Sequence, residues 1–280
     1  MSSSVEALHR GDLQEALATL QDEVRAEPAE PRHRVFLFQL LSVLGDWNRA
    51  LTQLNVARDL DPNSLLMAQT YQEVLSCEVL RQEVFTGKRS PVILGEPEPW
   101  MAKAVEALRR ASEGEYVAAC ELRDEAWADA PTTAGSIWLN KTDGSDSSVE
   151  SGIDFDWLAD CDTRLGPFLE VIVDGKYYWA PFHRIEKIGI EAPTDLRDCV
   201  WMPAQFMWAN QGQAVGMIPT RYPASESHEN PEIRLARTSE WHEPAEGVLQ
   251  GFGQRVLATD IGEFAIMDVR KIELRPEAAD

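Results

Sequence analysis

The spacing of apolar residues divides this chain into two parts. Up to about residue 130, apolar positions recur every three to four residues, as they do along amphipathic helices. Arg34–Leu44 is apolar nearly all round, which is typical of a helix buried between neighbours, and Leu65–Phe85 forms one long amphipathic pattern. Beyond about residue 153, short apolar runs alternate with turn signals, as strands do. We therefore expect an α+β protein, with about seven helices followed by an antiparallel β-rich domain.

A repeat of 34 residues runs through the helical part. Gly11-Asp12 and Gly45-Asp46 are each followed at the same offsets by Ala-Leu, by Leu and by a proline. This is the period of tetratricopeptide repeats, in which paired helices stack side by side. Glycine permits the tight turn between two helices, and aspartate can cap the second. A weaker third copy begins at Gly114-Glu115. The pattern predicts a tetratricopeptide-like array over residues 1–131.

Three hairpins are predicted in the β-rich part. Asp174-Gly175 lies between two apolar runs, and both residues tolerate the positive φ of a tight turn. Turns at Asn210–Gly212 and Asp260–Gly262 separate further strand pairs, whereas Asp154–Asp160 suggests a short helix. We expect a small barrel or sandwich over residues 153–280. The Ser-, Thr-, Gly- and Asp-rich residues 132–152 are expected to form a flexible linker.

Composition narrows the function classes. The chain has 47 acidic and 26 basic residues, a net charge of −21, and neither half is basic. Nucleic-acid binding needs clustered lysine and arginine, so no nucleic-acid partner is expected. Without a long apolar run or an opening signal segment, we expect no membrane association and a cytoplasmic location. The four cysteines form no close pair and are expected to be free thiols.

Motifs for catalysis or metal binding are missing from the sequence. The five histidines form no H-x-x-x-H or H-x-H pair, so a zinc site has no support. The acidic stretch from Asp143 to Asp162 fails the EF-hand frame, since Ala159 or Cys161 stands where glycine is needed. The glycines at 247–253 lack the Lys-Ser/Thr of a P-loop. We therefore assign no catalytic, cofactor-binding or metal residues and expect no cofactor.

Several longer motifs resemble the ImpE family, also called TagJ. They cover nearly the whole chain, from about residue 10 to residue 274: Phe36–Leu41, Gly45–Trp47, Leu94–Pro97, Arg164–Pro167, Tyr177–Phe182, Ala192–Asp198, Pro219–Pro223, Leu257–Asp260 and Asp268–Arg270. The resemblance implies a non-enzymatic, cytoplasmic accessory protein of the bacterial type VI secretion system. It also implies an adaptor that binds the small subunit of the contractile sheath through an N-terminal helix of that subunit. A role in sheath assembly or recycling is a further hypothesis.

A helical array offers a groove that suits an amphipathic helix. By analogy with tetratricopeptide arrays, the groove is lined by the first helix of each pair. The candidate partner-binding residues are therefore Arg32, Val35, Phe36, Gln39, Leu66, Gln69, Thr70 and Glu73. The apolar members of this set are equally compatible with a role in the core.

Two alternatives remain open. The first is an enzyme of unknown class with a polar site in the β domain, whose candidate residues are Asp195, Arg197, Asp198, Arg221 and Tyr222. The second is a structural subunit of a larger assembly. A second protein partner could also meet the β domain at its aromatic residues and at loops bearing Arg164, Arg197 and Arg221.

Overall fold

The computed structural model describes residues 3–140 and 152–275. Helices fill the first part of the chain, as predicted: α1 (Ser3–His9), α2 (Leu13–Ala26), α3 (Pro31–Val43), α4 (Trp47–Leu60), α5 (Leu65–Phe85), α6 (Pro99–Ser112) and α7 (Tyr116–Asp129), with the 3-10 turn η1 (Pro62–Ser64) between α4 and α5. Strands follow, so the α+β order predicted from apolar spacing is confirmed.

The Gly-Asp turns between paired helices form as expected. Gly11 and Gly45 have φ of 78° and 73°, and the carboxylates of Asp12 and Asp46 accept backbone hydrogen bonds at the starts of α2 and α4. The Asp46 amide donates to the Leu41 carbonyl at 3.0 Å and closes the C-terminal turn of α3. A left-handed glycine and a capping aspartate therefore define both helix hairpins.

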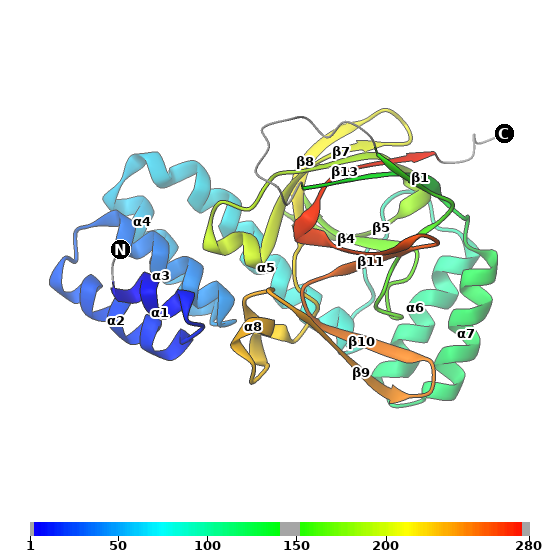
Figure 1. Ribbon diagram of the computed structural model, residues 1–280, viewed down its shortest axis with the longest axis horizontal. Coiled ribbons are helices and arrows are strands. Elements are labelled where there is room, and N and C mark those ends of the chain that lie inside the picture. Colours follow the sequence, from blue (N-terminus) through cyan, green and yellow to red (C-terminus); the bar gives the residue numbers. More distant parts are fainter. Residues whose placement is uncertain (1–2, 141–151, 276–280) are drawn as a thin grey trace.

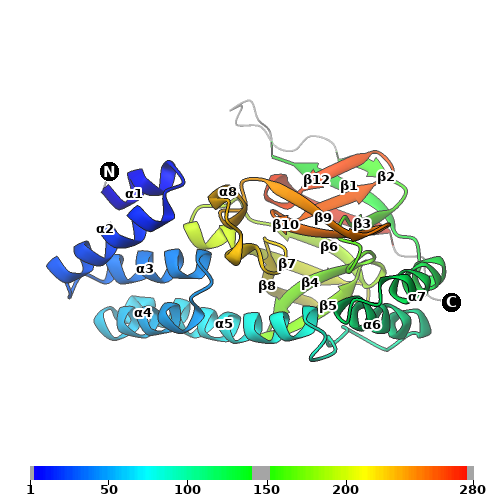
Figure 2. The same ribbon diagram turned by 90° about the horizontal axis from the view of Figure 1, so that it is seen from below.

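The third glycine turn lies far from the first two. Gly114, with φ of 79°, joins α6 to α7 as the repeat predicts. However, α5 carries the chain along one side of the β domain, and the α6–α7 hairpin packs at the opposite end of the molecule from α1–α4 (Figures 1 and 2). The first seven helices thus form an N-terminal arm (α1–α4), a long connecting helix (α5) and a separate hairpin (α6–α7). They do not form one uninterrupted stack.

The β domain is built on an eight-stranded antiparallel sheet with the order β2-β1-β13-β6-β7-β8-β4-β5. Its strands are β1 (Ala134–Leu139), β2 (Ile153–Phe155), β4 (Phe168–Val173), β5 (Lys176–Pro181), β6 (Ile185–Ile190), β7 (Trp201–Trp208), β8 (Gln213–Pro219) and β13 (Val269–Arg275). A three-stranded sheet contains β3 (Leu158–Asp160), β11 (Val256–Thr259) and β12 (Gly262–Ala265). A two-stranded sheet contains β9 (Ser239–Ala245) and β10 (Val248–Gly253). Short helical turns join them: η2 (Phe182–Arg184), η3 (Leu196–Cys199), η4 (Ser225–Ser227), α8 (Pro231–Arg234) and η5 (Ile266–Asp268).

The three predicted hairpins are present. Of the two forms expected for this domain, a small barrel or a sandwich, the described residues do not form a closed barrel. Asp174 and Gly175, with φ of 49° and 68°, join β4 to β5, and the other two turns join β7 to β8 and β11 to β12. In the described residues, β2 and β5 are opposite edges of an open sheet. The outer edge of β5 is covered instead by the loop before α6, because the Trp179 amide donates to the Val92 carbonyl and the Leu94 amide donates to the Trp179 carbonyl. The β5 edge is therefore protected without barrel closure.

Two local expectations need correction. Residues 134–139, expected to be part of a flexible linker, form β1 between β2 and β13. The prediction assigned these residues to the linker because polar residues dominate 132–152 as a whole, although 134–139 itself contains Ile137, Trp138 and Leu139. Its strand conformation depends on pairing with β13, far along the chain. The rest of the expected linker, residues 141–151, lies outside the described residues. Asp154–Asp160, expected to be a short helix, contributes β2 and β3.

The arm and the β domain share one hydrophobic core. Buried side chains of α3 and α5, including Phe38, Tyr71 and Leu75, belong to the same cluster as Trp179 and Trp201 of the sheet. The Tyr71 and Trp201 rings lie 5.8 Å apart. A second cluster lies within the β domain alone. Because apolar burial drives association, this shared core holds the arm in place on the sheet.

Candidate partner-binding site

The four candidate residues on α3 change from exposed to buried along the helix. Arg32, in the first turn, leaves 95% of its side chain exposed. Val35 and Phe36 are half-buried, and Gln39 is buried. The Gln39 amide Nε2 donates to the Asp195 carboxylate at 3.4 Å. The N-terminal half of α3 therefore remains accessible, whereas its C-terminal half faces the β domain.

The four candidates on α5 are exposed. Leu66 is the most notable, because 75% of its surface is accessible although it is aliphatic. Gln69 and Thr70 follow on the exposed surface. Glu73 lies over the β4–β5 turn, where a Cβ placed on Gly175 would be 2.4 Å from its carboxylate. The first two turns of α5 are thus open to a partner, and Glu73 marks where the protein's own sheet begins.

The turn η3 occupies the angle between α3 and α5. The Arg197 guanidinium lies 4.9 Å from the centre of the Tyr71 ring, and its Nη1 donates to the Met67 sulfur at 2.9 Å. Phe38 and Tyr71, whose ring centres are 5.5 Å apart, meet beneath it. The inner end of the predicted groove is therefore filled by the chain itself. Arg32, Val35, Phe36, Leu66, Gln69 and Thr70 remain at its outer end.

The polar side chains proposed for an enzymatic site have separate structural partners. Asp195 pairs with Arg197 at 2.6 Å. Asp198 accepts the backbone amides of Thr194 and Asp195 at 2.7 and 2.8 Å, which caps η3. These contacts hold a turn in place and do not direct the carboxylates toward one reacting centre.

Arg221 reaches from the β domain to the end of α3. Its guanidinium donates to the carbonyls of Val43 at 2.8 Å, Ser42 at 3.2 Å and Arg234 at 2.5 Å, and it is buried. The last carbonyls of a helix lack intrahelical donors and carry partial negative charge. Arg221 therefore acts as a C-cap for α3 and joins the arm to the sheet. It is not available to a second protein partner.

A buried ionic network lies beneath α5. Glu170 on β4 is fully buried and binds Arg81 of α5 through two bonds of 2.6 and 2.9 Å. Its carboxylate also accepts a hydrogen bond of 2.5 Å from the Tyr177 hydroxyl and an ionic bond from Arg255. Arg255 continues the network to Asp160.

The Asp160 end of the network contains Tyr222, the last of the enzymatic candidates. The Tyr222 hydroxyl donates to Asp160 at 2.9 Å. Each buried charge of the network thus has a charged or hydrogen-bonding partner, as a low-dielectric interior requires.

Burial and pairing shift the pKa values of these carboxyl groups in opposite directions. Burial tends to raise the pKa of Glu170, but the charges of Arg81 and Arg255 outweigh it and lower the pKa to about 2. At Asp160, burial outweighs the attraction of Arg255 and raises the pKa to about 6. Glu170 is therefore the firmly ionised centre of the network.

Sequence reasoning did not anticipate this network. The signal available was a polar residue inside an apolar run, as at Glu170 in Phe168–Val173. Such a residue indicates a buried ion but does not identify its partners, which lie 89 and 85 residues away in this case.

Most aromatic residues of the β domain belong to the core. Trp179, Trp201, Tyr177 and Tyr222 are essentially inaccessible. Trp157, just before β3, is 39% exposed. It lies at the rim of a hollow of about 300 Å³ formed with Trp127, near the end of α7. Trp157 is therefore the aromatic side chain best placed for an intermolecular contact.

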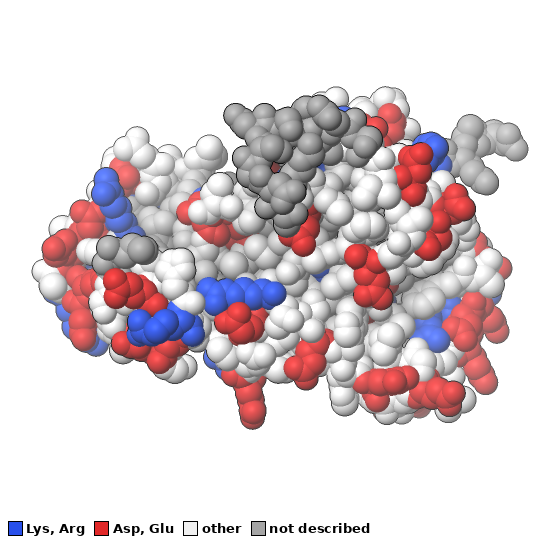
Figure 3. Space-filling view, in the orientation of Figure 1, with Lys and Arg blue, Asp and Glu red and all other residues white. Residues whose placement is uncertain are grey.

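The described parts of the chain contain neither a metal-binding cluster nor a membrane-spanning helix. Across residues 3–140 and 152–275, no group of three or more His, Cys, Asp or Glu side chains is arranged to hold a metal ion. In the same ranges, no helix combines the length and apolar character needed to cross a bilayer. The face shown in Figure 3 carries many more acidic than basic side chains, in line with the net charge of −21.

The fold and these contacts define a helical arm packed onto an antiparallel β domain. The ImpE protein family matches residues 152–273. The chain is 43% identical over 274 residues to the type VI secretion system accessory component TagJ of Pseudomonas aeruginosa, covering 98% of this chain and 92% of the relative. The chain therefore belongs to the ImpE/TagJ family.

A solved structure supports the same architecture. The crystal structure of a Vibrio parahaemolyticus protein aligns with a TM-score of 0.83 over 99% of both chains, at 24% identity. This match concerns the fold alone.

Proposed function

We propose that this protein is a non-enzymatic, cytoplasmic adaptor of a type VI secretion system. In this proposal it binds the sheath small subunit by holding an amphipathic N-terminal helix of that subunit. Membership of the ImpE/TagJ family and the name of the Pseudomonas relative support a secretion-accessory role. Binding of the sheath subunit would let the protein influence sheath assembly or recycling.

The observation that carries the binding proposal is the exposed apolar start of α5. Leu65 and Leu66 are 46% and 75% exposed, and Leu60 at the end of α4 is 38% exposed. Apolar side chains gathered in one short stretch of surface favour a docking contact over chance exposure. An amphipathic helix buries its own apolar stripe against such a surface.

The alternatives receive less support. The polar side chains of the enzymatic hypothesis are used to cap helices and pair buried charges. A structural subunit would present a broad apolar face, whereas the other large exposed apolar side chains, such as Val79, Val117 and Val215, are spread over separate elements.

Calorimetric titration with the N-terminal helix peptide of the cognate sheath small subunit tests the proposal. The full chain is required, because an isolated arm would expose the core side chains that it shares with the sheet. We expect micromolar binding that Leu66→Glu weakens by about tenfold or more, since it places a charge in an apolar contact. Val117→Glu on α7 is the matched control, because Val117 is 76% exposed and lies on the distant hairpin.

The possible outcomes test separately which partner is bound and where on the protein it binds. Absence of peptide binding would exclude this partner. Binding that both variants leave unchanged would place the contact away from α5. Gln69 is a suitable second position, but Gln39 is not, because a change there also disturbs Asp195.

A second protein partner remains a narrower proposal. Of the arginines first considered, Arg221 is buried and Arg197 pairs with Asp195. The exposed indole of Trp157 is the better candidate contact on the β domain.

A further inference from the structure

A cleft lies where the C-terminal half of α5 passes β10 and the loop after Tyr222. Its volume is about 190 Å³. Cofactor and drug-sized sites usually occupy roughly 300–1,000 Å³, so this cleft suits a single side chain better than a whole small molecule. We call it the α5 cleft and define it by Trp47, Arg81, Phe85, Arg164, Glu226 and Phe252.

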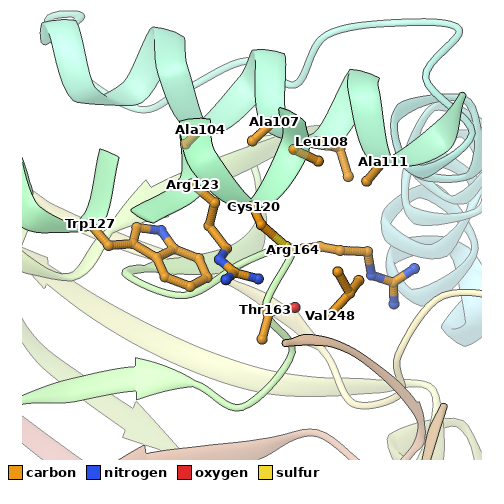
Figure 4. Close-up of a pocket in the computed structure, with 11 residues that line it drawn as sticks. Ala104, Ala107, Leu108, Ala111, Cys120, Arg123, Trp127, Thr163, Arg164 and Val248 are labelled. Carbon is orange, nitrogen blue, oxygen red and sulfur yellow. The ribbon is translucent and has the colours of Figure 1, made fainter. Parts of the chain in front are cut away.

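Two guanidinium groups form the floor of the α5 cleft. The central carbons of Arg164 and Arg81 lie 5.0 and 5.9 Å from the centre of the Phe85 ring. Figure 4 shows the Arg164 side chain extending away from Trp127 and Arg123, out of the small hollow under α6 and α7. Both charged heads therefore meet at Phe85, on the α5 side.

Arg164 retains hydrogen-bonding capacity there. Its Nε and Nη2 bind Asp162, with the shortest contact 2.5 Å long. Among the described residues, no acceptor is found for its Nη1. Asp162 is shared, because it also accepts the backbone amides of Arg164 and Gly251 at 2.9 Å each. A guanidinium has five N–H donors in a planar fork, so the remaining donors of Arg164 suit a further oxygen anion.

Arg81 adds a second donor of the same kind. Its Nε and Nη2 are bound to Glu170 and to the Arg221 carbonyl. Its Nη1 has only a long contact of 3.5 Å with Glu78. An anionic group seated near Phe85 would therefore meet two N–H groups that the protein leaves weakly used.

The walls of the cleft indicate what carries that anion. Trp47, Phe85 and Phe252 provide aromatic surface on three elements. Such surface suits the apolar flank of a peptide and offers nothing to a free inorganic ion. The strongly acidic chain also disfavours a polyanion, because a net charge of −21 repels it at long range.

We propose that the α5 cleft binds one aspartate or glutamate side chain of a partner protein, with an apolar or aromatic residue beside it. The carboxylate binds Arg164 and Arg81, and the neighbouring residue packs on Trp47 and Phe252. This site is distinct from the apolar start of α5 and does not depend on the helix-binding proposal.

Glu226 provides a second, independent test of the proposal. It lines the cleft and is half-buried, and among the described residues it forms no side-chain hydrogen bond or ion pair, although its charge acts on the buried Arg221. Its Cγ packs on the turn at Gly45. A negative charge there opposes entry of a carboxylate, so its removal must strengthen binding.

Three capped dipeptides serve as probes with the full-length protein: acetyl-Phe-Glu-amide, acetyl-Phe-Gln-amide and acetyl-Phe-Lys-amide. Binding is followed through the side-chain Nε–H resonance of Arg164 and the indole N–H resonance of Trp47. We expect saturable shifts with the Glu probe and an affinity for the Gln probe that is about tenfold weaker. Equal responses to these two probes, or preference for the Lys probe, would overturn the proposal.

Two variants complete the test through the Trp47 resonance. Arg164→Gln should abolish saturable binding of the Glu probe, whereas Arg123→Gln, which changes an arginine outside the cleft, should leave it unchanged. Glu226→Gln removes a rim charge that forms no ion pair among the described residues, and it should tighten binding severalfold. Unchanged affinity in Glu226→Gln, or full affinity in Arg164→Gln, would exclude a carboxylate in this position.

Discussion

Arg81 of α5 and Glu170 of β4 form a two-bond ion pair, with Nε–Oε1 2.6 Å and Nη2–Oε2 2.9 Å, at the contact between the long helix and the sheet. Neither residue has an appreciable exposed surface. The pair joins two elements that are 89 residues apart in the chain. It therefore helps to fix α5, and through it the arm, against the β domain, together with the shared core.

Removing one member of this pair should be costly, since it leaves a buried charge without its partner. We expect Arg81→Met or Glu170→Gln alone to lower the free energy of unfolding by about 3–5 kcal/mol. The double variant should lose less than the sum of the two. Urea unfolding of the four proteins in a double-mutant cycle measures the coupling.

An exposed ion pair provides the comparison. Arg10 and Glu15 are 2.6 Å apart, but their side chains are 56% and 48% exposed. The same cycle on this pair should give coupling close to zero, because water screens both charges. A buried pair that couples no more strongly than this exposed one would contradict its role in holding the arm.

The stability of the protein should depend on pH through two carboxyl groups with opposite signs. The folded pKa of Glu170, about 2, lies below its ordinary value of 4.5, so its stabilisation is complete above pH 4.5 and is lost as the pH falls toward 2. The folded pKa of Asp160, about 6, lies above 3.8, so stability increases as the pH falls from 6 toward 4. Each change should amount to roughly 3 kcal/mol.

Urea unfolding at a series of pH values separates the two groups. Glu170→Gln should flatten the loss of stability below pH 4.5, and Asp160→Asn should remove the gain between pH 7 and pH 4. Glu121→Gln on the exposed face of α7 serves as the control. If the profile of Asp160→Asn matches that of the unchanged protein, ionisation of Asp160 does not determine the upper part of the curve.

The parts of the fold that could be predicted depend on local chemistry. Gly45-Asp46 and Asp174-Gly175 define their turns through backbone freedom and capping within a few residues, and both are found as expected. By contrast, β1 forms because Ile137 pairs with Ile272, and no nearby residue signals that partner. The position of α6–α7 likewise depends on tertiary contacts such as that of Trp100 with Phe168, whose rings are 4.9 Å apart.

The candidate groove also combines features set by local sequence with features set by tertiary contacts. Helical spacing places Gln39 and Leu66 on the expected helices, but spacing cannot tell which side chains the β domain will cover. Gln39 binds Asp195, which lies 156 residues away, whereas Leu66 stays exposed. Which of these side chains a partner can reach is decided by η3, which covers the inner ends of α3 and α5 and leaves the outer ends exposed.

The turn at Gly45 offers a test of how closely the arm and the β domain are fitted. Its φ of 73° is unfavourable for any residue with a Cβ, and a Cβ there would lie 2.4 Å from Cγ and 2.8 Å from Cβ of Glu226. Gly114 has a similar φ of 79° in the α6–α7 turn, but a Cβ added there would have nothing within 4 Å among the described residues. Gly114→Ala should therefore cost only the backbone strain, about 1–2 kcal/mol. Gly45→Ala should cost at least about 1 kcal/mol more. The atoms it would meet are Cβ and Cγ of Glu226, which are close to the Glu226 backbone and cannot move away without moving that backbone. Urea unfolding of the two variants measures how much of the loss in unfolding free energy comes from the clash with Glu226. Equal losses in the two variants would mean that the Glu226 loop moves aside at no energetic cost.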